Sequence, residues 1–166
     1  MKDLTHSSSA KVKAALERAK KKGDATWIRP LLAAYAARSE DGLREEMRTL
    51  LGTLKLSAAE EVFLEALREE EFAEVRADVL GFLWSCGFTC DGNLALVAEV
   101  ACQGDFRQAM EGATLLEQVE SATDEKDILE ALVLAGEALQ DETKEDIHPF
   151  LEAMKQHLGM LSDALM

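Results

Sequence analysis

Proline, β-branched runs and long apolar stretches are all scarce in this sequence. Its 166 residues include only two prolines, Pro30 and Pro149, so few helices have to be interrupted. Runs of valine, isoleucine and threonine are nearly absent, which leaves little from which to build a sheet. Alanine, leucine and glutamate dominate instead, and all three favour helix. The sequence therefore predicts an all-α fold.

Signals for membranes and for export are also lacking. No run of about eighteen apolar residues occurs, so we predict neither a membrane-spanning helix nor a membrane partner. The first residues lead through Ser7–Ser9 into a charged helix and have no apolar signal-peptide core. The three cysteines, an odd number in a helical protein, fit a reducing compartment better than a disulfide framework. We expect a cytoplasmic protein of bacterial type.

Side chains that could act in catalysis or metal binding do not form a recognisable site. Cys86, Cys90, Cys102 and His148 lack the tight paired spacing of structural zinc ligands, and no third group orients a Cys–His pair. Cys86 follows an apolar stretch and is expected to be a small core residue. Carboxylates gather at helix starts and turns, where the helix dipole and solvent stabilise them. We therefore predict no catalytic residue, no metal site and no cofactor.

Negative charge is concentrated towards the C-terminus. Residues 1–22 hold seven basic and two acidic side chains, a net charge of +5. Residues 23–90 carry −6 and residues 91–166 carry −13, for a total of −14. An acidic body repels phosphate backbones, so nucleic acid is not an expected partner. The basic first helix could be a solvated face, or an arm for an acidic surface of the same chain or of a neighbouring copy.

Apolar spacing and caps predict nine helices over the chain. The first covers about 9–22, carries six lysines and arginines, and ends at Gly23. Residues 1–8 before it are expected to be flexible. The other eight form four hairpins. The first pairs helices at about 25–37 and 40–54, and the second pairs a helix from 57 with one at about 73–86. The third pairs a helix at about 92–103 with one from 105, and the fourth pairs helices that start near 123 and 143. Short connections between them favour antiparallel neighbours.

Buried stripes and caps can be assigned within these helices. Trp27, Leu31 and Tyr35 share one face, and Phe106 and Met110 are placed in the buried stripe of their helix. Ser57 and Glu60 have capping-box spacing, and Asp105 with Gln108 three residues on is a second N-cap. Trp84 lies off the main apolar stripe of its helix. It is either a core residue of a thin layered fold or a binding hot spot.

A repeated motif opens the second helix of each hairpin. An acidic residue comes directly before an apolar residue, or one position earlier in the first motif, and the apolar residue is followed, three times out of four, by arginine. The first three motifs are 32 and 31 residues apart and the fourth follows after 41. The pairs are Leu43-Arg44, Val75-Arg76, Phe106-Arg107 and Ile147-His148. Self-similarity at this period is typical of helical repeat proteins.

Residues 43–52 and 74–83 resemble the second helix of a short HEAT-type repeat, in which an apolar-Arg pair opens the helix and Leu-Gly follows. Leu51-Gly52 keeps that ending, whereas the fourth motif has His148 in place of arginine. The resemblance covers about residues 24–161. It implies a right-handed α-solenoid of about four antiparallel helical hairpins, preceded by one N-terminal helix, in a single domain over 1–166.

The resemblance also implies that the second helices line a concave surface. The outward residues of the repeated positions would then be Arg44, Arg48, Arg76, Arg107 and Gln108. Two interpretations remain open for these residues. They either form structural hydrogen bonds between repeats or face a ligand. With Trp84, they are the candidate partner-binding residues of the sequence.

Three functional hypotheses follow. The first is a non-enzymatic scaffold or adaptor that binds a protein or peptide on its concave face. The second is an enzyme or cofactor-handling protein on the same scaffold, since HEAT-like repeats occur in phycobilin lyases and in alkylpurine DNA glycosylases. The acidic charge argues against the glycosylase. The third is a homo-oligomer, in which the basic first helix meets the acidic C-terminal hairpin head to tail.

Overall fold

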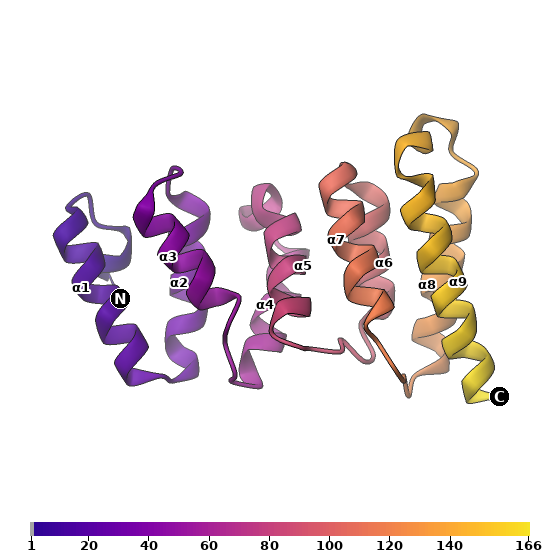
Figure 1. The fold of residues 1–166 in the computed structure, drawn as a ribbon, viewed down its shortest axis with the longest axis horizontal. Helices are drawn as coiled ribbons and strands as arrows, with labels where there is room; N and C mark the ends of the chain where they lie inside the picture. The colour runs from indigo at the N-terminus through magenta and orange to yellow at the C-terminus, as the bar shows by residue number, and fades with distance from the viewer. Residues whose placement is uncertain (1) are drawn as a thin grey trace. The chain divides into compact units, whose positions relative to one another are not determined.

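The computed structural model describes residues 2–166, and the chain divides into unit 1 (Met1–Val75) and unit 2 (Arg76–Met166). Every regular element among these described residues is helical, which confirms the predicted all-α class (Figure 1). None of the helices in residues 2–166 is both long and apolar enough to cross a membrane. The single repeat domain over 1–166 stays a prediction.

Unit 1 contains four α-helices and three short 3-10 helices. The first α-helix has its predicted bounds, and so does the second when the 3-10 turn that precedes it is included. Residues 1–8, expected to be flexible, contain the 3-10 helix η1, whose Leu4 is buried. The elements are η1 (Lys2–Thr5), α1 (Ser9–Lys22), η2 (Ala25–Trp27), α2 (Ile28–Ala37), α3 (Gly42–Leu51), α4 (Ala58–Arg68) and η3 (Glu70–Val75).

The core of unit 1 is centred on α2, which packs against η1, α3, α4 and η3. Trp27, Leu31 and Tyr35 are buried on one face of this segment, as the spacing predicted. Asp24 accepts from the Thr26 N–H before the helix begins. Pro30 falls in the first turn of α2, where its missing N–H costs no helical hydrogen bond.

One predicted helix end in unit 1 is confirmed, one cap was not predicted, and one predicted cap is wrong. Gly23 ends α1 in the left-handed conformation, with φ at 61°, and donates to the Ala19 carbonyl. Asp41 caps α3 by accepting from the Arg44 N–H. Ser57 does not form the predicted capping box, because its backbone is already helical and its hydroxyl caps nothing. An N-cap side chain reaches the first turn from an extended backbone, which Ser57 lacks.

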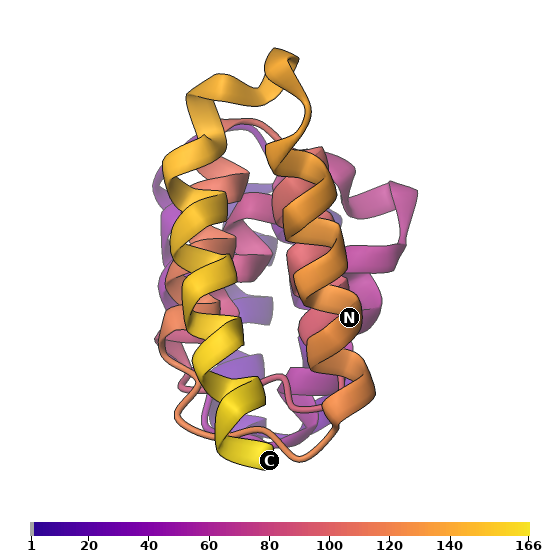
Figure 2. The ribbon, with the colours of Figure 1, turned by 90° about the vertical axis from the view of Figure 1, so that its right-hand side faces the viewer.

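Unit 2 contains five α-helices in two rows. α7 packs against both α5 and α9, and α6 packs against α8, while α6–α7 and α8–α9 contacts join the rows. In Figure 2, α8 and α9 lie side by side and run in opposite directions. The elements are α5 (Arg76–Ser85), α6 (Leu94–Gln103), α7 (Phe106–Glu117), α8 (Glu125–Leu139), η4 (Glu142–Ile147) and α9 (His148–Leu165).

The way in which the helices of unit 2 begin explains why some observed helix bounds differ from the predicted ones. Asp105 caps α7 through the Gln108 N–H as predicted, and Asp124 caps α8 through the Asp127 N–H. The predicted helix at 73–86 begins later, at Arg76, since the preceding turn is 3-10. The last helix likewise starts at His148 after a 3-10 segment.

Three residues predicted to lie in the core of unit 2 are not buried. Phe106 and Met110 are 53% and 37% exposed, although both lie at helical spacing with the buried Ala109 and Ala113. They lie on the flank of α7 towards α9 rather than at the centre of its buried face. Cys86 is half-buried just beyond the end of α5, whereas Cys90 and Cys102 are the buried cysteines.

Candidate functional site

Arg44 and Arg48, two of the candidate residues in unit 1, both contact the buried Tyr35. The guanidinium of Arg44 lies 4.3 Å from the centre of the tyrosine ring, and its Nε donates to the Tyr35 carbonyl at 3.1 Å. The Nε of Arg48 donates to the Tyr35 hydroxyl at 3.0 Å. Stacking on an aromatic face and donation to a fixed acceptor both restrict a guanidinium. The aromatic ring therefore positions both arginines along α3.

Acidic residues neutralise the same two arginines. Glu40 forms ion pairs with Arg44 and, at 3.2 Å, with Arg48. Glu45 pairs with Arg48 at 2.7 Å on the surface of α3. With this many intramolecular partners, the two guanidinium groups serve first to join α3 to the end of α2. A ligand carboxylate would have to displace Glu40 or Glu45 to reach them.

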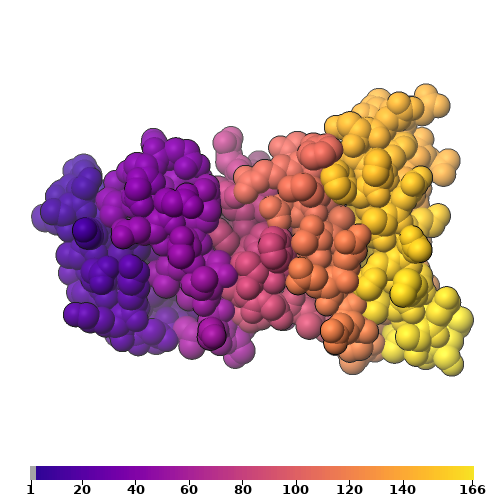
Figure 3. All heavy atoms as spheres, viewed as in Figure 1, coloured from indigo at the N-terminus to yellow at the C-terminus, as the bar shows by residue number. Residues whose placement is uncertain are grey.

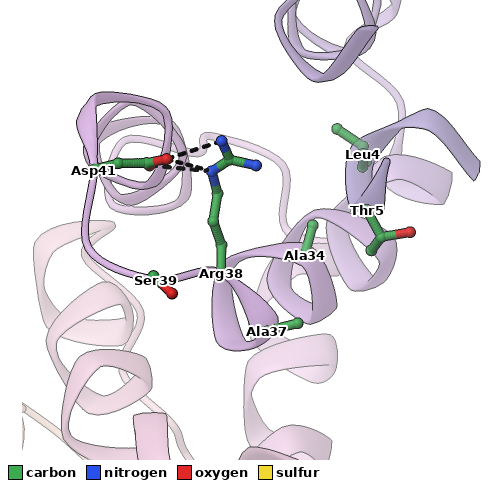
Figure 4. A pocket seen from close by; sticks show the side chains of 7 residues that line it. All are labelled: Leu4, Thr5, Ala34, Ala37, Arg38, Ser39 and Asp41. Carbon is green, nitrogen blue, oxygen red and sulfur yellow. Dashed lines mark hydrogen bonds and ion pairs between the residues drawn. The ribbon is translucent and has the colours of Figure 1, made fainter. Parts of the chain in front are cut away.

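A hollow of about 320 Å³ lies beside the turn between α2 and α3 (Figure 4). Arg38 and Asp41 form its charged wall, and their side chains point towards each other, with Arg38 Nε at 2.9–3.0 Å from the two carboxylate oxygens. Hydrogen bonding from the Arg38 side chain lowers the pKa of Asp41, and the Arg44 N–H adds to the effect. The hollow thus offers an ion pair of zero net charge beside Leu4 and Ala34, and the lowered pKa favours the ionised form of Asp41.

Arg107, in unit 2, forms an ion pair with Asp78 of α5. The carboxylate of Asp78 is only 6% exposed, whereas about half of the Arg107 side chain reaches solvent. This pair joins the first turn of α7 to the first turn of α5. It is the kind of contact between neighbouring second helices that the structural interpretation of the repeated arginines predicts.

Trp84 and Gln108 also have partners within unit 2. The indole N–H of Trp84 donates to Glu111 at 2.6 Å and so links α5 to α7, while its ring is half-buried. The side-chain amide of Gln108 donates to the Val100 carbonyl near the end of α6 at 2.7 Å. Arg76 is half-buried at the start of α5. The structure therefore brings Trp84, Arg107 and their acidic partners together on α5 and α7, while Arg44 and Arg48 lie in unit 1.

The aromatic residues that the sequence placed in the core form a surface cluster instead. The rings of Phe106 and Phe150 meet edge to face, with centroids 5.0 Å apart, and so bridge the starts of α7 and α9. Phe150 is half-buried, and Met110 lies one turn beyond Phe106 on the same flank of α7. We call Phe106, Met110 and Phe150 the α7–α9 cluster. Figure 3 shows the face of unit 2 on which α7 and α9 adjoin.

Cys102 lines a hollow of about 220 Å³ between α6 and α8, together with Glu137 and Lys144. Burial raises the pKa of the Cys102 thiol, and its sulfur lies 3.8 Å from the Leu134 carbonyl. A nucleophilic cysteine needs the opposite shift, towards the thiolate. Among residues 2–166, no group of three or more His, Cys, Asp or Glu side chains is arranged to hold a metal ion.

Comparison with known proteins identifies no relative: no family model, no curated protein and no solved structure matches the chain. Function can therefore be inferred only from the geometry of the structure. Sequence reasoning missed the α7–α9 cluster because helical periodicity marks an apolar stripe without saying which of its edges a neighbouring helix covers. The signal that was available is one phenylalanine near the start of each of the two helices, Phe106 as the first residue of α7 and Phe150 as the third residue of α9.

Proposed function

We propose that this chain is a non-enzymatic interaction module with a HEAT-like, right-handed α-solenoid fold, and that it binds a protein or peptide on the face formed by α7 and α9. The observation that carries the proposal is the α7–α9 cluster. Phe106 keeps more than half of its surface in solvent while it is stacked on Phe150.

An exposed, pre-ordered aromatic pair is suited to binding. Aromatic and methionine side chains are enriched at the centres of protein interfaces, where they supply large contact areas at a small entropic cost. The stacking contact already fixes the Phe106 ring, so a partner need not order it. Met110 adds a flexible apolar side chain that adapts to different surfaces. Arg107, the candidate arginine of α7, is paired with the buried Asp78 and is better suited to supporting this face than to forming it.

The charge of unit 2 specifies the partner further. Residues 76–166 hold eighteen acidic and five basic side chains, a net charge of −13. Such a field accelerates encounter with a positively charged molecule and disfavours an acidic one. The partner is therefore a basic protein segment that presents one or more large apolar side chains to the α7–α9 cluster.

Site-specific photocrosslinking in the cell of origin tests the proposal. A benzophenone amino acid replaces Phe106, and a matched control carries it at Glu61, an exposed position on α4. We expect one discrete adduct at position 106 that is missing at position 61, and we expect its crosslinked peptide to be basic. Equal adduct patterns at both positions, or an adduct with a small molecule or nucleic acid, would contradict the proposal.

A further inference from the structure

A second apolar surface lies on α8, away from the α7–α9 cluster. Leu129 and Val133 are 47% and 58% exposed, and their spacing of four residues places them on one side of the helix. Figure 2 looks onto α8 and α9, and no other helix of unit 2 lies in front of them. Two adjacent β- and γ-branched side chains in water are a feature that a bound partner would cover.

Acidic side chains flank this apolar pair. Glu130 and Glu137 stand three residues before and four residues after Val133, so both border it on the helix surface. Glu130 pairs with Lys126 at 3.7 Å, and Glu137 has no ion pair among the described residues. We call Leu129, Glu130, Val133 and Glu137 the α8 patch. It needs a partner that is basic and that lets Leu129 and Val133 approach closely.

Helix α1 of the same chain has these two properties. It buries Val12, Ala15, Leu16 and Ala19 in unit 1 and exposes the opposite side. That side carries Ala10 and Ala14, whose small side chains allow close approach of another helix. It also carries Lys13 and Lys21, both exposed and without an ion pair among residues 2–166, and between them Glu17, whose charge is offset by Lys20 at 3.2 Å. We call Ala10, Lys13, Ala14 and Lys21 the α1 patch.

The charged pairs of the two patches have matching spacing. Eight residues separate Lys13 from Lys21, about 12 Å along a helix, and seven separate Glu130 from Glu137, about 10.5 Å. Ala10 and Lys13 also border an open hollow of about 510 Å³ that Leu43 of α3 helps to line. An apolar side chain the size of Leu129 fits that space. The rim also holds two acidic residues, Asp41 and Glu46, so the glutamates of an incoming α8 must face the lysines of α1 rather than α3.

We propose that the α8 patch of one copy binds the α1 patch of a second copy. The contact is heterologous, since each copy contributes a different surface. Repetition of such a contact gives open head-to-tail chains unless the geometry closes a ring. The attraction is both apolar and ionic, so it weakens as salt screens the lysine–glutamate pairs. This inference does not depend on the α7–α9 cluster.

Sedimentation velocity over a wide protein concentration range tests the proposal. We expect the weight-average mass to rise with concentration at about 50 mM salt, and association to weaken at least five-fold at about 500 mM. Leu129→Glu with Val133→Glu should abolish the rise, and so should Lys13→Glu with Lys21→Glu. Because all four side chains are exposed, we expect each variant to remain folded, and circular dichroism checks this.

A mixing experiment then separates head-to-tail association from every symmetric alternative. The α8 variant keeps an intact α1 patch, and the α1 variant keeps an intact α8 patch. A mixture of the two should therefore form a dimer and nothing larger. A contact between identical patches would instead give dimers in whichever variant keeps that patch, without the other variant. A monomer at every concentration for the parent chain, or dimers in either variant alone, would overturn the proposal.

Met110→Glu is the matched control that keeps this proposal separate from the proposed function. It alters an exposed apolar residue on α7 and should leave self-association unchanged within two-fold. If it abolished oligomers as fully as the α8 variant, the α7–α9 face would be the site of self-association and the assignment to α1 and α8 would be wrong. If Phe106 gave no crosslink while the mixing result held, the proposed function alone would fail.

Discussion

The carboxylate of Asp127, on α8, accepts a hydrogen bond from the backbone N–H of Leu94 at 2.7 Å, and a second from Ala95 at 2.9 Å. These two N–H groups are among those left free at the start of α6. One helix of unit 2 therefore supplies the cap of its neighbour. The negative charge at this N-terminus also interacts favourably with the helix dipole. Asp127 is buried, so water cannot replace it.

Asp127→Asn tests the contribution of this cap to stability. The amide keeps one oxygen acceptor and the side-chain volume, but it loses the charge and the second acceptor. We expect the free energy of unfolding, measured by urea denaturation, to fall by about 2 kcal/mol. The control is Asp163→Asn, an exposed residue near the end of α9, for which we expect a change of less than about 0.5 kcal/mol. Equal losses of stability from both changes would show that the Asp127 carboxylate does not stabilise the protein by capping α6.

Tyr35→Phe isolates the contact between Tyr35 and Arg48. The ring remains to stack with Arg44, and only the hydroxyl that accepts from Arg48 is lost. We expect a loss of about 1 kcal/mol in the free energy of unfolding. A double-mutant cycle with Arg48→Met should then show that the two changes are not additive. Strict additivity would mean that the hydroxyl and the guanidinium do not interact energetically.

Arg107→Ala removes the charged partner of a buried carboxylate. Asp78 would keep its burial and lose the guanidinium of α7, so we expect destabilisation by about 1–2 kcal/mol, at the lower end for such pairs because Arg107 is half-exposed. Arg18→Ala, which breaks an exposed pair with Asp3 at 3.2 Å, is the comparison. Exposed pairs contribute little, so its effect should stay below about 0.5 kcal/mol.

The hydrogen bonds between Asp91 and Thr123 predict a pH-dependent part of the stability. The Thr123 hydroxyl, at 2.6 Å, and its N–H, at 2.9 Å, lower the pKa of Asp91. A carboxyl with a lower pKa in the folded state stabilises the protein above its unfolded pKa of about 3.9 and loses that effect as the pH falls through its folded pKa. The difference in the free energy of unfolding between the parent chain and Asp91→Asn should therefore be largest above about pH 5, and this difference should become smaller below about pH 4. A difference that stays constant from pH 6 to pH 3 would contradict this account.

Local features of the fold could be predicted from the sequence. Gly23 ends α1, Asp105 caps α7, and the stripe from Trp27 to Tyr35 is buried, since each depends on residues within one or two turns of each other. Ser57 shows the limit of this reasoning. Its spacing to Glu60 is that of a capping box, but Ser57 itself has helical φ and ψ angles and lacks the extended backbone that the motif needs.

The candidate site could be predicted only in part, because it depends on contacts between distant residues. Arg44 and Arg48 could be selected from the repeat, but their common partner Tyr35 lies on another helix. Nothing in the spacing of α7 indicates that Phe106 meets Phe150, forty-four residues later, at the surface. Helix packing decides which edge of an apolar stripe stays exposed, and a single sequence does not encode that choice in any local pattern.

We propose that the α7–α9 cluster binds a basic protein segment. The most direct test of this proposal is a calorimetric titration of the basic segment crosslinked at position 106 against the parent chain, Phe106→Ala and Val133→Thr. We expect Phe106→Ala to weaken binding at least about ten-fold, while Val133→Thr, an exposed change on α8, leaves the dissociation constant within two-fold. Equal affinity of the parent chain and Phe106→Ala would contradict it.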